Sequence, residues 1–89
     1  MKPNPAQSEL RRQYIELRDS NAQNFHDISR LLLKVYDKQL FALEDVSDRS
    51  ELTIEYKKQR DATAQKFRDT QELLKWEFER QFREMEGEG

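Results

Sequence analysis

Residues 6–86 read AQSELRRQYIELRDSNAQNFHDISRLLLKVYDKQLFALEDVSDRSELTIEYKKQRDATAQKFRDTQELLKWEFERQFREME, without a single Gly or Pro. Sheet proteins build their tight turns on Gly, Asn-Gly or Pro, so this stretch predicts an all-α chain. Charged residues make up 38% of the chain and apolar residues 35%, and the mean hydropathy is −1.13. We therefore expect one small, very polar helical unit, close to the lower size limit for an independent core.

The apolar residues of the first half recur every three or four positions, which is the spacing of one helix face. The positions that share this face are Leu10, Tyr14, Leu17, Asn21, Phe25, Ile28, Leu32, Val35, Gln39, Leu43 and Val46. Asn21 and Gln39 are polar, and our hypothesis is that they set the register and the oligomeric state. With Ser8 as N-cap, the pattern predicts a helix over 8–46 after a disordered lead-in over 1–7.

A polar break, Ser47-Asp48-Arg49-Ser50, follows the first pattern. Asp48 and Glu51 have the spacing of a capping box, and Ser50 is a rival N-cap. The break predicts a turn over 47–50, a second helix over 50–86 and a flexible tail over 87–89. The second helix face consists of Leu52, Tyr56, Arg60, Thr63, Phe67, Thr70, Leu74, Phe78, Phe82 and Met85. No internal repeat is evident.

Two arms of nearly equal length predict an antiparallel helical hairpin that forms a single domain over 8–86. Folding at 47–48 brings together residues whose numbers total about 95, as in an αα-hairpin. Leu31–Leu33 then lies opposite Ala62–Ala64, and Asn21 lies opposite Leu74. One continuous helix in a parallel coiled coil remains the alternative. The hairpin is favoured because the apolar period is near 3.6, whereas a long left-handed supercoil requires 3.5.

The apolar arc of the first helix is wider than one neighbour requires. Placed at 100° per residue, Ile15, Ala22, Leu33, Tyr36 and Leu40 widen the arc to roughly 200°, whereas one neighbour takes about 100°. The second helix likewise carries Ile54, Leu73 and Trp76 off its main face. We therefore expect a homodimer of hairpins that forms a four-helix bundle or short coiled coil. The alternative is that the extra apolar surface binds a different protein.

The sequence offers no set of residues suited to catalysis, cofactor binding or metal binding. There is no cysteine, and His26 is the only histidine, so thiolate chemistry and histidine-based metal sites are excluded. We expect no enzyme activity, no cofactor, no metal and no small-molecule substrate. The longest apolar run is Leu31–Leu33, which excludes a membrane span. With no disulfide framework, a reducing cytoplasm is the expected location.

A protein–protein interaction module is the function that these patterns favour: a small adaptor, regulator or inhibitor. Tryptophan is enriched at the centres of interfaces, so Trp76 is the first contact that we predict. The other predicted contacts are Leu73, Ile54, Leu33 and Leu40. The alternative is a nucleic-acid-binding regulator, because basic residues gather in one section of the second helix. Those residues are Lys57, Lys58, Arg60, Lys66 and Arg68.

Overall fold

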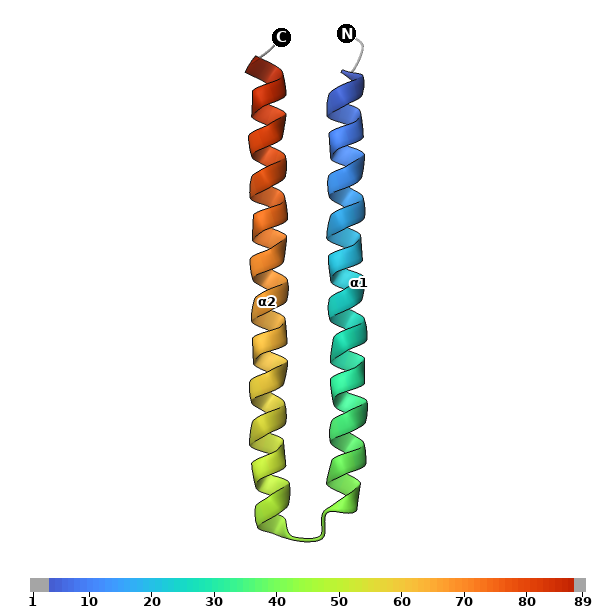
Figure 1. Ribbon diagram of the computed structural model, residues 1–89, viewed down its shortest axis with the longest axis vertical. Helices are drawn as coiled ribbons and strands as arrows, with labels where there is room; N and C mark the ends of the chain where they lie inside the picture. The colour runs from blue at the N-terminus through green and yellow to red at the C-terminus, as the bar shows by residue number, and fades with distance from the viewer. Residues whose placement is uncertain (1–3, 88–89) are drawn as a thin grey trace.

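The computed structural model describes residues 4–87 and consists, over these residues, of two long helices joined by a short turn (Figure 1). Helix α1 spans Pro5–Ala42 and helix α2 spans Val46–Gly87. They lie side by side and antiparallel, so that both chain ends are at the same end of the molecule. The molecule measures 67 × 16 × 12 Å and has a radius of gyration of 20.2 Å, against about 12 Å for a compact chain of this length. The all-α prediction is confirmed for this part of the chain.

Helix α1 begins earlier than predicted. The side chain of Asn4 accepts a hydrogen bond from the backbone N–H of Ala6 at 2.9 Å, and Pro5 is the first helical residue. Proline suits this position because its ring presets a helical φ and no N–H is needed there. Ser8 is therefore not the N-cap, and the predicted lead-in is wrong for residues 4–7. Its first three residues lie outside the described part of the chain.

The turn also comes earlier than predicted, at 43–45 instead of 47–50. Leu43 leaves the helix in an extended conformation, with φ −94° and ψ 131°. Asp45 then caps α2, because its carboxylate accepts the N–H of Ser47 at 2.7 Å and its carbonyl accepts the N–H of Arg49 at 3.1 Å. No residue between 4 and 87 has a positive φ, so this turn needs no glycine. Gly87, predicted to begin the tail, belongs to α2, and 88–89 lie outside the described residues.

Three stacked aromatic pairs join the helices and define their register. Ring centroids are 4.6 Å apart in Tyr14–Phe78, 4.6 Å in Phe25–Phe67 and 4.4 Å in Tyr36–Tyr56. The numbers of each pair total 92 instead of about 95, because the turn lies nearer the N-terminus. Asn21 accordingly lies against Phe67 and not against Leu74. The side-chain amide of Asn21 donates a hydrogen bond to the backbone carbonyl of Phe67 at 3.4 Å.

Successive aromatic pairs are eleven residues apart on both helices, and the half-buried side chains follow the same period. Eleven residues make three turns of about 3.67 residues, close to the 3.6 of a straight helix, so the line of contact drifts only slightly and in the right-handed sense. We call the row of half-buried side chains between the helices the seam. On α1 the period places Tyr36 and Leu40 in the seam, whereas Val35 and Gln39, which we predicted there, are exposed. Leu17, Ile28 and Val46 are also exposed. On α2 every predicted face residue is half-buried except Arg60.

The two helices are also copies of one sequence unit, which the sequence analysis missed. Fourteen of the 37 residues in 8–44 recur in 50–86, at a separation of 42. The recurring residues of the first copy are Ser8, Glu9, Leu10, Tyr14, Arg18, Asp19, Ala22, Gln23, Phe25, Asp27, Leu31, Leu32, Gln39 and Glu44. Contacts recur as well, since Arg18 over Tyr14 and Arg60 over Tyr56 are both 5.9 Å from the ring centroid. The hairpin is therefore an antiparallel pair of repeats related about the Phe25–Phe67 stack.

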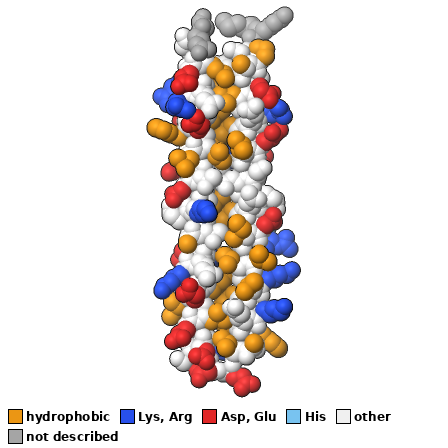
Figure 2. Space-filling view, in the orientation of Figure 1, with side chains coloured by type: hydrophobic (Ala, Val, Ile, Leu, Met, Phe, Trp, Pro, Cys, Tyr) orange, Lys and Arg blue, Asp and Glu red, His pale blue; other side chains and the backbone are white. Residues whose placement is uncertain are grey.

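A closed core is absent from this arrangement over residues 4–87, where no side chain is buried. The seam side chains are half-buried because each helix covers the other from one side only. Figure 2 shows the result, with apolar side chains open to solvent along the line between the helices. The two broad faces and two outer edges of the hairpin are thus all available surfaces.

Candidate interaction surface

One broad face of the hairpin carries two grooves built from equivalent positions. The groove nearer the chain ends, of about 110 Å³, is lined by Leu10, Gln13, Tyr14 and Leu17 of α1 and by Leu74, Glu77, Phe78 and Gln81 of α2. The groove nearer the middle, of about 240 Å³, is lined by Asn21, Asn24, Phe25, Ile28, Thr63, Lys66, Phe67 and Thr70. Each residue of one groove lies eleven positions from its counterpart in the other, so the grooves repeat with the seam. We call this side the grooved face.

Apolar side chains of α1 dominate the grooved face. Leu17, Ile28 and Val35 are all exposed, and the eleven-residue period places them along one side of α1. The corresponding positions of the second repeat hold Gln59, Thr70 and Glu77. The two repeats thus have similar seam residues but different surface residues. On the grooved face, α1 is the more apolar of the two helices.

The outer edge of α2 carries a shallow hollow of about 650 Å³ around two apolar side chains. Leu73 and Trp76 are 67% and 66% exposed, and the hollow is completed by Asp69, Glu72, Lys75 and Glu79. We call it the α2 hollow. Trp76 lies midway between the seam residues Leu74 and Phe78 in sequence, two residues from each. At about 100° per residue it therefore points away from α1.

The structure brings together only part of the predicted contact set. Leu73 and Trp76 share the α2 hollow. Ile54 and Leu33 are exposed elsewhere on α2 and α1, whereas Leu40 is half-buried in the seam. These five residues therefore do not form one continuous patch.

The five predicted nucleic-acid contacts are dispersed around α2. Arg60 lies over the Tyr56 ring and within 3.7 Å of the Asp61 carboxylate. Arg68 donates to Gln65 at 2.8 Å, and Lys66 lines the central groove. Lys57 and Lys58 are neighbours on a helix and point about 100° apart. No single basic surface results from these five residues.

A second outer hollow, on α1, was missed by the sequence analysis. It has a volume of about 210 Å³ and is lined by Asp27, Arg30, Leu31 and Lys34. We call it the α1 hollow. Each of its residues lies 42 positions before a residue of the α2 hollow. The signal that reveals it is the 42-residue repeat, which can be read from the sequence alone.

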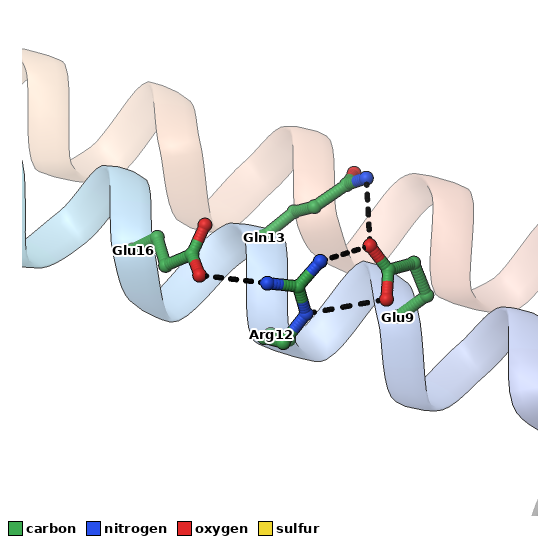
Figure 3. Close-up of polar contacts among 4 residues, drawn as sticks. All are labelled: Glu9, Arg12, Gln13 and Glu16. Carbon is green, nitrogen blue, oxygen red and sulfur yellow. Dashed lines mark hydrogen bonds and ion pairs between the residues drawn. The ribbon is translucent and has the colours of Figure 1, made fainter.

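The strongest local electrostatic contacts are surface pairs within single helices. Arg12 bonds Glu9 and also reaches the Glu16 carboxylate at 2.9 Å, while Gln13 donates to Glu9 at 3.4 Å (Figure 3). Chiefly because of the Arg12 bond, the pKa of Glu9 lies below its ordinary 4.5. These contacts stabilise the surface of α1.

A similar cluster lowers the pKa of the Glu77 carboxyl on α2. The side chain of Gln81 donates to Glu77 at 2.9 Å, and Arg80 bonds the same carboxylate. The bond from Gln81 is the larger cause of the lowered pKa, followed by the bond from Arg80. Glu77 is also exposed to solvent, so this cluster is again a surface feature of one helix.

Residues 4–87 contain no cluster of potential metal ligands and no helix apolar enough to span a membrane. No three carboxylate or histidine side chains of this region lie close enough together to hold a metal ion. Neither α1 nor α2, within the same bounds, has the length of apolar sequence that crosses a bilayer.

No family model, curated protein or solved structure matches the chain. The grooved face and the outer hollows of the hairpin are therefore the features from which a function can be inferred.

Proposed function

We propose that the protein is a non-enzymatic protein–protein interaction module, a small helical adaptor, regulator or inhibitor that buries apolar helix faces against a partner. One observation carries the proposal: no side chain from Asn4 to Gly87 is buried, while large apolar side chains are exposed on both helices. Extended apolar surface of this kind is typical of proteins that bind other proteins. Leu33, Ile54, Leu73 and Trp76 are the proposed contacts outside the seam, and Leu40 is a proposed contact that lies half-buried in it.

The first partner in this proposal is a second copy of the chain. A broad side of the hairpin measures 67 by 16 Å, an area of about 1,000 Å². Two such faces in contact would bury an area in the range of stable dimers. Face-to-face packing of two hairpins gives a closed four-helix bundle, and closed two-fold dimers are the commonest assemblies.

The grooved face is the side that we assign to this dimer contact. Its strip on α1 is uncharged and consists of Gln13, Leu17, Asn24, Ile28, Val35 and Gln39. On the other broad side, the eleven-residue period places Ile15, His26 and Asp37 in one row. Burying a carboxylate there without a partner would be unfavourable. The α2 side of the grooved face also holds a carboxylate, Glu77, but Arg80 and Gln81 already bond it, and Lys66 lies on the same face. The grooved face is thus the better dimer surface.

The second repeat provides substitutions that test the assignment. Leu17→Gln, Ile28→Thr and Val35→Glu, combined, replace α1 residues with those found 42 positions later, so the helix should tolerate them. We expect this triple variant to be a monomer by light scattering over a wide range of concentrations, with helical circular dichroism retained.

The matched control combines Ile15→Lys with Phe41→Arg, which also introduces residues of the second repeat, but outside the grooved face. We expect this variant to remain a dimer. A wild-type chain that is monomeric at every concentration would overturn the bundle. A triple variant that is still dimeric would overturn the assigned face.

A further inference from the structure

The α1 and α2 hollows occupy equivalent positions of the two repeats. Asp27, Leu31 and Lys34 of the first correspond to Asp69, Leu73 and Trp76 of the second. The aspartate and the leucine are the same in both repeats, although seam packing does not require either of them. Both leucines are well exposed, Leu31 at 62% and Leu73 at 67%.

The two hollows lie on opposite outer edges of the hairpin. Lys34 is two residues from each of the seam residues Leu32 and Tyr36, just as Trp76 is two residues from Leu74 and Phe78. At about 100° per residue, both side chains point directly away from the other helix. Neither edge would be covered in a bundle formed through the grooved face.

The charged residues that line the two hollows give them net charges of opposite sign. The α1 hollow has two cations, Arg30 and Lys34, and one carboxylate. The α2 hollow has three carboxylates, Asp69, Glu72 and Glu79, and one cation. Figure 2 shows basic side chains gathered along the outer edge of α1 towards the turn. Each hollow is thus an exposed leucine within a charged rim, and the two rims have opposite net charge.

We propose that the α1 hollow of one copy of this chain binds the α2 hollow of a second copy, edge to edge. Leu31 packs on Leu73, the Lys34 ammonium lies over the face of Trp76, and Arg30 pairs with Glu72. A lysine above an indole ring is a favourable cation–π pair, and complementary charges fix the register of such contacts. This proposal deepens the proposed interaction function and rests on it, by assigning a second contact between copies.

An edge-to-edge contact of this kind does not close. The interface joins two different patches, and these lie on opposite edges, so each copy has one free hollow left after binding. Such heterologous contacts add further copies unless a rotation closes the ring. The proposal therefore predicts association that continues beyond a dimer as the protein concentration rises, and that weakens as salt screens the charges.

Charge reversal on the full-length chain tests the contact. One variant combines Arg30→Glu with Lys34→Glu, which makes both hollows acidic, and another combines Glu72→Lys with Glu79→Lys, which makes both basic. By sedimentation velocity, we expect each alone to lose association beyond the dimer, with affinity at least tenfold weaker. An equimolar mixture should regain it, since each acidic α1 hollow then meets a basic α2 hollow. Glu44→Lys with Glu51→Lys is the control for the added positive charge and should associate as the wild type does.

The same series in the Leu17→Gln, Ile28→Thr, Val35→Glu background separates this proposal from the bundle. Edge contacts should persist there even when the face-to-face dimer is lost. Association beyond the dimer that survives both reversals, or that the mixture does not restore, overturns the edge contact and leaves the bundle standing. A wild-type chain with no species larger than a dimer also overturns it.

Discussion

The Phe25 ring stacks on the Phe67 ring at a centroid distance of 4.6 Å, and these two residues are the same member of two sequence repeats. The pair is therefore the point about which the two arms are related. On either side of it, Tyr14–Phe78 and Tyr36–Tyr56 repeat the contact. Equivalent substitutions in the two halves of the seam should therefore have similar effects on stability.

Removal of the central ring should destabilise the hairpin. Phe25→Ala deletes one side of the Phe25–Phe67 stack, and we expect a loss of about 2 kcal/mol, less than for a fully buried phenylalanine because the site is half-buried. Urea denaturation followed by circular dichroism measures this loss. Phe41→Ala is the matched control, since that ring is 94% exposed, and its stability should stay within about 0.5 kcal/mol of the wild type.

The substitution Asn21→Leu should make the seam more apolar and less selective for one register and one oligomeric state. Leu10, Leu32 and Leu43 lie at the same place in the eleven-residue period. We expect Asn21→Leu to raise stability by about 1 kcal/mol and to change the oligomer distribution, because the amide's bond to the Phe67 carbonyl is lost. Thermal denaturation and light scattering measure these effects. If neither the melting temperature nor the distribution changes, Asn21 does not set the register.

Trp76 should report on assembly without contributing to the fold. Because it is 66% exposed, we expect Trp76→Ala to leave the helical circular dichroism unchanged and to weaken association or partner capture. In the wild-type protein, indole fluorescence should shift to shorter wavelength as the concentration rises. Loss of helicity in Trp76→Ala would instead assign the side chain to a core.

Acid should weaken the helices through Glu9 and Glu77. The folded-state pKa values of both carboxyls lie below the ordinary 4.5, so their stabilising effect is present above that value and is lost as the pH falls through the lower folded-state pKa. We expect stability to decrease with acidification below about pH 4.5. In Arg12→Gln, the Glu9 titration followed by NMR should move up towards 4.5, while that of Glu77 stays in place. An unmoved Glu9 titration would contradict the assigned cause.

Nucleic-acid binding, the alternative function, can be tested by chromatography on immobilised DNA or RNA. The five basic residues of α2 do not share one surface, so we expect no retention on DNA or RNA even at low salt. Steep loss of retention with rising salt is the signature of phosphate contacts. If that signature were observed, and if Lys57→Gln with Lys58→Gln weakened it, the interaction proposal would lose its priority.

Several features followed from the sequence because they depend on local spacing. Every residue predicted for the seam of α2 is half-buried except Arg60, because the apolar residues of α2 define a single helix face. The half-buried Thr53, Ala64, Gln71 and Gln81 were not predicted. The seam of α1 was predicted less well. Val35 and Gln39 have the same helical spacing as Tyr36 and Leu40, and the wide apolar arc does not distinguish between the two sets. The 42-residue repeat was also readable, and it would have pointed to the α1 hollow.

The helical nature of the chain follows from its sequence alone, because the sequence lacks Gly and Pro from Ala6 to Glu86 and keeps a helical apolar period. The position of the turn and the pairing of residues across the helices depend instead on packing between the two helices. Asp45 and Asp48 are both suitable caps, and backbone preference alone does not separate them. The choice depends on stacking between rings far apart in sequence, which fixes the register, places the turn at 43–45 and leaves the two repeat hollows on opposite edges.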